Sequence, residues 1–297
     1  MPSLKDLKTR IGSVKSTRKI TSAMKMVAAA KLRRAQEAAE AARPFAGRME
    51  AMVESVAGSM RGCDGGPRML TGDGRDKVHL LVAFAADRGL CGGFNASIVK
   101  AVRLKARELE DAGKTVKIFC VGKKGVDALK REMNDKIIDF ATFAGRKRIT
   151  YADAADIGSK ISTMFEEGLF DVCAIFFNRF QSAMTQVVTP RRLIPLLGHD
   201  TANEDGTLVD ASKASHIFEP EEDEILAKLL PLNINTQIFQ ALLESAASEH
   251  GARMTAMDSA TRNAGDMIDN LTLTYNRTRQ ACITKELIEI ISGAEAL

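Results

Sequence analysis

The sequence predicts an α/β protein built from a long antiparallel coiled coil of its two terminal helices and a central α/β domain. Residues 1–58 and 221–297 carry helical heptad patterns that are too long for ordinary globular helices. Residues 77–220 alternate short apolar strands with amphipathic helices. Residues 59–76 are rich in glycine and aspartate and are predicted to be a linker.

The C-terminal helix has the most regular pattern. Apolar and small residues recur from Leu243 to Cys282 at alternating steps of four and three, and such a stripe needs a partner helix in water. Pro220 suits a first helical turn, with acidic residues directly after it, and Pro231 is expected to kink the helix or to begin its long run. The stripe consists of Leu243, Ala247, His250, Met254, Met257, Thr261, Ala264, Ile268, Leu271, Tyr275, Thr278 and Cys282.

The N-terminal helix is the expected partner. It is predicted from Leu4 to about Gly58 and contains one proline, Pro44. Because a compact segment separates the two helices in the chain, they most simply pack antiparallel. The apolar stripe comprises Leu4, Leu7, Ile11 and Val14, slips near Thr17, and resumes at Ile20, Met24 and Val27.

The charge of the N-terminal helix is strongly one-sided. Residues 1–48 hold twelve basic and three acidic side chains, which favours an acidic partner over a merely solvated face. Nucleic acid is the alternative partner. It is disfavoured because the basic residues are spread around the helix and aromatic residues make up only 5% of the chain.

Composition sets further bounds on the class of protein. The 297 residues contain no apolar run of the length of a membrane span, and the first residues lack the apolar segment of a signal peptide. The five cysteines are scattered without paired spacing, which favours reduced, buried thiols in a cytoplasmic protein.

The central domain is predicted to be a Rossmann-like, three-layer α/β domain with a mostly parallel sheet. Pro190 places the last strand at an edge or a bend of this sheet. The expected strands are 78–85, 115–121, 136–143, 171–180 and 185–197, and the expected helices are 96–111, 123–133 and 151–167.

Motifs of nucleotide enzymes are absent from this domain. Gly113-Lys114-Thr115 follows a helix and precedes a strand, which is the opposite order to a phosphate-binding loop. The loop from Gly89 to Gly93 reads G-x-x-G-G and is interpreted as a tight structural turn, not a dinucleotide site. The four histidines have no metal-binding spacing. We therefore expect no catalytic residue, no bound cofactor and no metal in this chain.

Four blocks of sequence carry a resemblance to a known family. Residues 283–294 (ITKELIEIISGA) and 18–31 (RKITSAMKMVAAAK) resemble the C-terminal signature and the N-terminal helix of gamma subunits of F-type ATP synthases. Residues 87–92 (DRGLCG) and 248–254 (SEHGARM) match two further blocks in the family's order. The resemblance spans essentially the whole chain.

The resemblance implies a central rotor shaft. In that family the coiled coil enters a hexamer of alpha and beta subunits, and the α/β domain contacts the epsilon subunit and the ring of c subunits. The shaft binds no cofactor, whereas the complex uses Mg-ATP, ADP and phosphate. The lack of a mitochondrial presequence favours a bacterial complex, with this chain peripheral to the cytoplasmic face of the inner membrane. The alternative function is a stand-alone coiled-coil adaptor or nucleic-acid-binding protein.

The resemblance also implies roles for single residues. Met24 matches a position near the beta loops that transmit torque, although it equally suits coiled-coil packing. Its neighbour Lys25 is included in this partner-binding group, but it is basic where some members carry an acid. Glu249 and Arg253 match a coupling pair, with a plain surface pair as the alternative. The remaining matches are a polar cluster for a catch loop of beta (Arg279, Gln280, Thr284), a bearing tip (Ile288, Ile290, Ile291, Leu297), a segment facing the c ring and epsilon (His216, Phe218, Glu219) and a structural loop (Asp87, Arg88, Gly89, Gly92).

Overall fold

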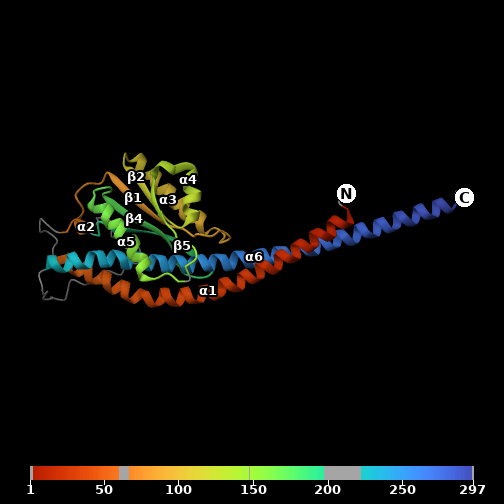
Figure 1. Cartoon of the computed structure of the whole chain (residues 1–297), viewed down its shortest axis with the longest axis horizontal. Coiled ribbons are helices and arrows are strands. Elements are labelled where there is room, and N and C mark those ends of the chain that lie inside the picture. The colour runs from red at the N-terminus through yellow and green to blue at the C-terminus, as the bar shows by residue number, and fades with distance from the viewer. Residues whose placement is uncertain (1–2, 60–66, 147, 197–221, 296–297) are drawn as a thin grey trace. The chain divides into compact units, whose positions relative to one another are not determined.

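The computed structural model describes residues 3–59, 67–146, 148–196 and 222–295. Two very long helices enclose an α/β segment in the order of the chain (Figure 1). The elements are α1 Leu4–Ser59, α2 Arg68–Thr71, β1 Val78–Phe84, α3 Phe94–Asp111, β2 Thr115–Val121, α4 Lys123–Met133, η1 Asn134–Lys136, β3 Ile137–Ala141, α5 Tyr151–Glu166, β4 Val172–Phe180, β5 Gln186–Ile194 and α6 Glu222–Glu295.

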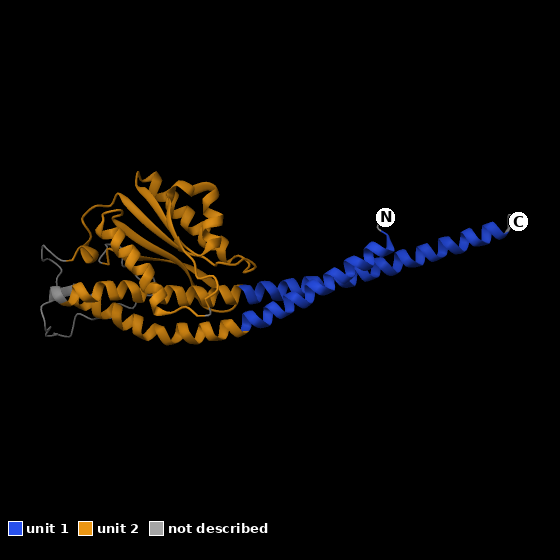
Figure 2. Ribbon diagram, in the orientation of Figure 1, with its two compact units in different colours: residues 1–29, 253–297 blue, residues 30–252 orange. Residues whose placement is uncertain are grey.

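The chain divides into two compact units (Figure 2). Unit 1 consists of residues 1–29 and 253–297 and contains only parts of α1 and α6. Unit 2, residues 30–252, contains the sheet with its helices and the remaining parts of α1 and α6. These limits cut through both long helices and so differ from the limits expected from sequence. The functional division into a shaft and a domain stays a prediction.

The five strands of unit 2 form one sheet in the order β3-β2-β1-β4-β5. The first four are mutually parallel, and β5 is antiparallel to β4, so the predicted mostly parallel sheet is confirmed. The order 3-2-1-4 is that of a doubly wound, Rossmann-like fold. Pro190 lies on β5 at the edge of the sheet, as its missing N–H requires.

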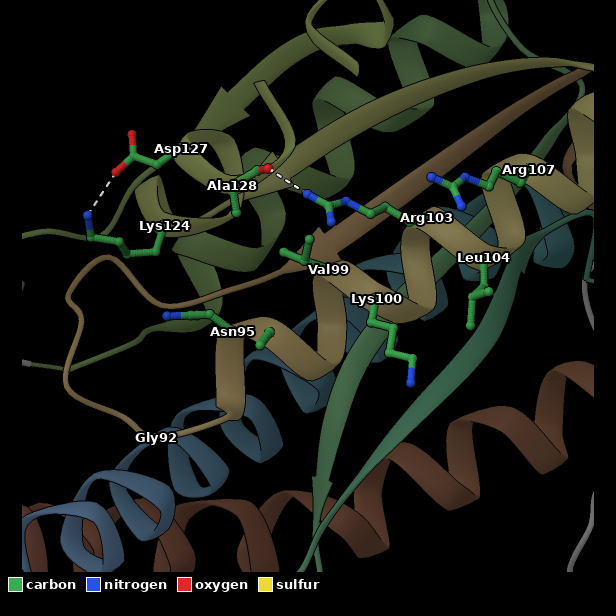
Figure 3. Close-up of a pocket in the computed structure, with 11 residues that line it drawn as sticks. Gly92, Asn95, Val99, Lys100, Arg103, Leu104, Arg107, Lys124, Asp127 and Ala128 are labelled. Atoms are coloured by element: carbon green, nitrogen blue, oxygen red, sulfur yellow. Dashed lines mark hydrogen bonds and ion pairs between the residues drawn. The ribbon is translucent and has the colours of Figure 1, made fainter. Parts of the chain in front are cut away.

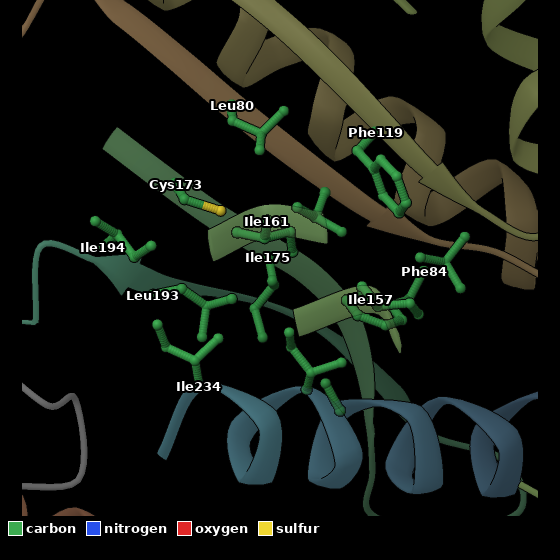
Figure 4. Close-up of a cluster of buried hydrophobic side chains, with 14 of the residues drawn as sticks. Leu80, Phe84, Phe119, Ile157, Ile161, Cys173, Ile175, Leu193, Ile194 and Ile234 are labelled. Atoms are coloured by element: carbon green, nitrogen blue, oxygen red, sulfur yellow. The ribbon is translucent and has the colours of Figure 1, made fainter. Parts of the chain in front are cut away.

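Apolar clusters cover both faces of the sheet. On one face, Ile157 and Ile161 of α5 and Ile234 of α6 belong to the same buried cluster as Leu80 of β1 (Figure 4). On the other face, side chains of α3 and α4 pack against the neighbouring Leu81. Because successive strand residues point to opposite faces, a strand buried on both sides reads as a continuous apolar run. The fold is thus three-layered, and α6 supplies part of one layer.

Sheet pairing sets the ends of the strands. Strand β2 and helix α4 have the predicted limits, whereas β1, β3, β4 and β5 are each shorter than predicted at one or both ends. The short elements α2 and η1 were not predicted. Helix α5 starts with a capping box, in which the Thr150 N–H donates to the Asp153 carboxylate at 2.8 Å.

The helices of unit 1 run antiparallel. Lys25 pairs with Asp258, and the hydroxyl of Thr261 donates to that of Thr21, so ascending α1 corresponds to descending α6. The predicted stripe of α6 is confirmed through Thr278: Met257, Ala264 and Ile268 are buried, and Thr261, Leu271, Tyr275 and Thr278 are half-buried. The prediction is wrong at Cys282, whose thiol is exposed because α1 no longer lies beside α6 there.

The predicted slip in the α1 stripe is wrong. Ile20 and Val27 face outward with 60% and 57% exposure. Their neighbours Thr21 and Ala28 are half-buried and buried, which continues a seven-residue spacing from the half-buried Val14. Thr21 and Ala28 occupy the interface there together with the half-buried Met24, so among the predicted residues Ile20 and Val27 mark the wrong face.

One of the two expectations for Pro231 is wrong. Pro231 lies inside α6, which begins at Glu222, so the alternative that Pro231 begins the helix is wrong. Pro220 lies outside the described residues. Among the described helices, none has the length and apolar character needed to span a lipid bilayer.

Candidate functional site

The C-terminal segment of α6 is exposed on all sides. Every described residue from Arg279 to Ala294 has an exposed side chain, whereas Thr278 is still half-buried. The antiparallel pairing explains this limit. Thr21 lies opposite Thr261, so Leu4, seventeen residues earlier on α1, lies opposite residue 278. Beyond that point α6 continues without α1 for about 25 Å, at 1.5 Å per residue.

This exposed segment, residues 279–294, carries two kinds of predicted contact residue. Arg279, Gln280 and Thr284 are exposed and come first along the helix. The predicted bearing tip follows, and Leu297 lies outside the described residues. The exposed large apolar side chains are Ile283 (49%), Leu287 (54%), Ile288 (58%), Ile290 (67%) and Ile291 (58%), of which Ile283 and Leu287 were not singled out from sequence.

Lys25 forms an ion pair inside the coiled coil. Its Nζ lies 2.5 Å from Oδ1 of Asp258, and Arg262 lies 3.0 Å from the other oxygen of the same carboxylate. The hydrogen bond from Lys25 lowers the pKa of Asp258 below its ordinary value. Met24, beside Lys25, is half-buried. Asp258 was missed from sequence, although its four-residue spacing to Arg262 was a usable signal.

The block around residues 248–254 packs against the end of β4. Ser248 is fully buried, and its hydroxyl donates to the carbonyl of Asn178 at 2.9 Å. At Gly251 a Cβ would lie 3.3 Å from Cα of Ala183, so only a glycine fits there without a shift. Glu249 and Arg253, the predicted coupling pair, both have half-buried side chains in this part of α6.

The same helix fills the crevice where a doubly wound fold usually binds a nucleotide. In such folds the ligand lies beyond the carboxyl ends of the two strands at which the strand order reverses, here β1 and β4. Ser245 donates to the carbonyl of Phe84 at the end of β1, at 3.5 Å. Ser248 and Glu244 bond to the backbone near the end of β4. Polar side chains of α6 thus lie against the ends of both strands.

The predicted structural loop after β1 is organised by Asp87. Its carboxylate accepts hydrogen bonds from the N–H of Lys123 at 2.9 Å, the hydroxyl of Thr142 at 2.8 Å and the N–H of Phe143 at 2.9 Å. It thereby joins the ends of three strands and caps α4. The other members, Arg88, Gly89 and Gly92, are exposed. Positive φ angles occur at Leu90 (63°) and Gly92 (57°), and not at Gly89.

An open groove of about 710 Å³ lies between α3 and α4 (Figure 3). Its rim is basic, but neighbouring groups satisfy much of this charge. Arg103 lies 3.2 Å from Glu132 and donates to the carbonyl of Ala128 at 3.0 Å, and Lys124 lies 2.9 Å from Asp127. The positive charge of the groove is therefore partly neutralised within the chain.

One predicted group remains without a structural account. His216, Phe218 and Glu219 lie outside the described residues. Within the described ranges, no three histidine, cysteine or acidic side chains come together as a metal site.

Comparison with known proteins decides the family. The family model described as ATP synthase matches residues 3–297. The ATP synthase gamma chain of Jannaschia sp. (strain CCS1), a bacterium, is 58% identical over 297 residues and covers 100% of both chains. The chain belongs to the family of ATP synthase gamma chains. Its function is that of the central rotor shaft of an F-type ATP synthase, and it is a subunit of that ATPase complex.

Solved structures agree with the fold of a gamma chain. A chain of the central stalk and c ring of the Tetrahymena thermophila mitochondrial ATP synthase is 26% identical, with a TM-score of 0.61 over 81% of this chain and 99% of that one. A chain of the Euglena gracilis mitochondrial ATP synthase is 20% identical, with a TM-score of 0.69 over 99% of this chain and 94% of that one, and this likeness concerns the fold alone.

Proposed function

We propose that this gamma chain is a non-catalytic shaft that acts through the exposed segment of α6, residues 279–294. Inside the alpha and beta hexamer this segment turns with the rotor and reports its angle to the three catalytic sites. The observation that carries the proposal is the exposure of every described side chain in this segment, five of them large and apolar. A helix of that kind gains its stability from tertiary packing, so another chain must surround it.

The order of residues along the segment suits two separate contacts. Arg279, Gln280 and Thr284 offer hydrogen bonds that form and break as a catch loop of beta passes. Ile288, Ile290 and Ile291 offer an apolar tip, whose contacts are non-directional and hinder rotation little. Met24 and Lys25 act beside the beta loops, where Lys25 is already held by Asp258.

The filled crevice of the sheet supports the absence of catalysis. Because α6 bonds to the ends of β1 and β4, the fold has a helix where a nucleotide would otherwise lie. We expect the chain itself to bind no cofactor. Mg-ATP, ADP and phosphate would bind elsewhere in the complex.

The remaining partners are proposed for the α/β domain. We assign it to the epsilon subunit and the c ring, with His216, Phe218 and Glu219 on the side that faces them and Glu249 and Arg253 in coupling. The Tetrahymena relative is described as part of a central stalk with a c ring, which supports this assignment. The chain would then be peripheral to the cytoplasmic face of the bacterial inner membrane, held there through the complex.

The proposal is tested with Arg279, Gln280 and Thr284 replaced together by alanine in the assembled complex. Loss of the catch-loop bonds is expected to lower ATP synthesis and ATP hydrolysis about tenfold or more, since a bond to the charged Arg279 contributes about 1.5–3 kcal/mol and about 1.4 kcal/mol is tenfold in rate. Asn276→Ala with Arg277→Ala, also exposed on α6, is the matched control. Wild-type rates in the triple variant, or ATP hydrolysis by the purified chain alone, would contradict the proposal.

A further inference from the structure

Three segments of unit 2 meet at one buried carboxylate. Glu244 of α6 has 2% of its side chain exposed. Its Oε1 accepts a hydrogen bond from Nε of Arg43 on α1 at 2.7 Å, and its Oε2 accepts one from the N–H of Phe180 at the end of β4 at 2.9 Å. Nη2 of Arg43 also donates to the carbonyl of Phe180 at 3.3 Å. The guanidinium, the carboxylate and the backbone N–H and C=O of one residue, Phe180, thus close a ring of hydrogen bonds.

A gain in folding stability is a weak explanation for a buried ion pair of this kind. Burial of a carboxylate is costly, and a buried ion pair often contributes no more than apolar side chains of the same size. Here both carboxylate oxygens are bonded, and the hydrogen bond to Glu244 raises the pKa of Arg43. What the ring adds over apolar packing is direction, because hydrogen bonds require a particular alignment of donor and acceptor.

The directional hydrogen bonds of this ring matter for α1 because α1, in its described residues, shares no buried apolar cluster with the sheet. Helix α6 contributes Ile234 and Ile238 to the cluster on one face of the sheet. No residue in the described part of α1 belongs to either cluster that covers the sheet. Instead Val53 and Val56 of α1 pack with α2 and the start of α6. Apolar packing opposes separation of the helices but allows α1 to roll on α6.

We propose that Arg43, Glu244 and the backbone N–H and C=O of Phe180 form a torque joint that makes α1 turn together with the α/β domain. This inference rests on the proposed shaft function, in which torque from the c ring enters through the α/β domain. Arg43 and Glu244 are positioning residues: they touch no nucleotide and act by keeping α1 from rolling on α6 while the shaft is under load.

The test measures the torsional stiffness of the rotor in the whole complex. The hexamer is immobilised, a probe is attached to the α/β domain, and the angular fluctuations of the probe are recorded with turnover stopped. Arg43→Gln and Glu244→Gln are expected to increase the angular variance, because each removes the ion pair. Arg43→Lys keeps the charge but loses the second N–H, and should fall between them and the wild type.

Arg33→Gln is the matched control. It removes one positive charge from α1 and one ion pair, but that pair joins Arg33 to Glu37 on the same helix and is highly exposed. Its angular variance should equal that of the wild type. ATP hydrolysis should persist in all the variants, whereas ATP synthesis under load should fall in Arg43→Gln and Glu244→Gln only.

If Arg43→Gln and Glu244→Gln both had the angular variance of the wild type, the proposed torque joint would be overturned. A lower unfolding midpoint in these variants would not rescue it, because an ion pair that only stabilises the fold would also lower the midpoint when removed. An equal rise in Arg33→Gln would overturn it too. Arg43→Gln leaves the buried carboxylate of Glu244 without its ion-pair partner and could prevent assembly. In that case Glu244→Gln is the deciding variant, because the group it leaves unpaired is the half-exposed guanidinium of Arg43. A wild-type complex whose rotor does not turn with ATP hydrolysis would instead refute the shaft function.

Discussion

Two stretches of α6 have opposite surroundings although they belong to one continuous helix. Residues 233–252 lie in unit 2 and are mostly buried, with polar side chains such as Glu244 and Ser248 bonded to strand ends. Residues 279–294 are exposed throughout, yet they include five large apolar side chains. The first stretch has its partners within the chain, and the second is the stretch for which we propose partners from other chains. The comparison separates the anchored part of α6 from the proposed working part.

The largest expected contrast is between two isoleucines of these stretches. Ile238 is fully buried, and Ile238→Ala should lower the free energy of unfolding of the isolated chain by about 2–5 kcal/mol, because it leaves a cavity. Ile290 is 67% exposed, and Ile290→Ala should change it by less than about 0.5 kcal/mol. Urea unfolding measures both. A similar loss in the two variants would remove the distinction between anchored and working stretches.

Two glycines give a smaller contrast with the same substitution. Gly251→Val drives a side chain into Ala183 and the ring of Phe180, each with an atom 3.3 Å from the place that the new Cβ would occupy, and should cost about 1–3 kcal/mol. At Gly293 nothing lies within 4 Å, so Gly293→Val should be neutral or slightly stabilising. Thermal unfolding of both variants measures the difference, and a neutral Gly251→Val would show that the β4–β5 turn yields easily.

The smallest expected effect concerns the Lys25–Asp258 pair, between the two stretches. Because Lys25 lowers the pKa of Asp258, the pair contributes stability above the ordinary carboxyl pKa and loses it as the pH falls through the lowered value. In Lys25→Met the pKa of Asp258 should rise, as NMR titration of the carboxyl carbon would show. Salt should weaken the effect, since both side chains are partly exposed. An unchanged pKa would mean that Arg262 alone determines it.

Local sequence determined the types of the main elements. The steps of four and three along α6, and the short apolar runs that became β1, β2 and β4, depend on residues close together in the chain. Local sequence did not predict which face of α1 forms the interface near Thr21. Ile20 and Val27 look like interface residues in the sequence, but in the folded chain they are exposed, whereas Thr21 is half-buried and Ala28 is buried.

Only the tertiary structure determined which charged side chains are buried and which groups they bond to. Glu244 reads as an ordinary helix-surface acid, but its partner Arg43 lies 201 positions away in the chain and its second partner is a backbone N–H. Asp87 likewise gains its role from groups near residues 123 and 142. A pattern of neighbours predicts which segments form helices and strands, because those periods are local. Which polar group is buried, and against what, depends on segments that only the folded chain brings together.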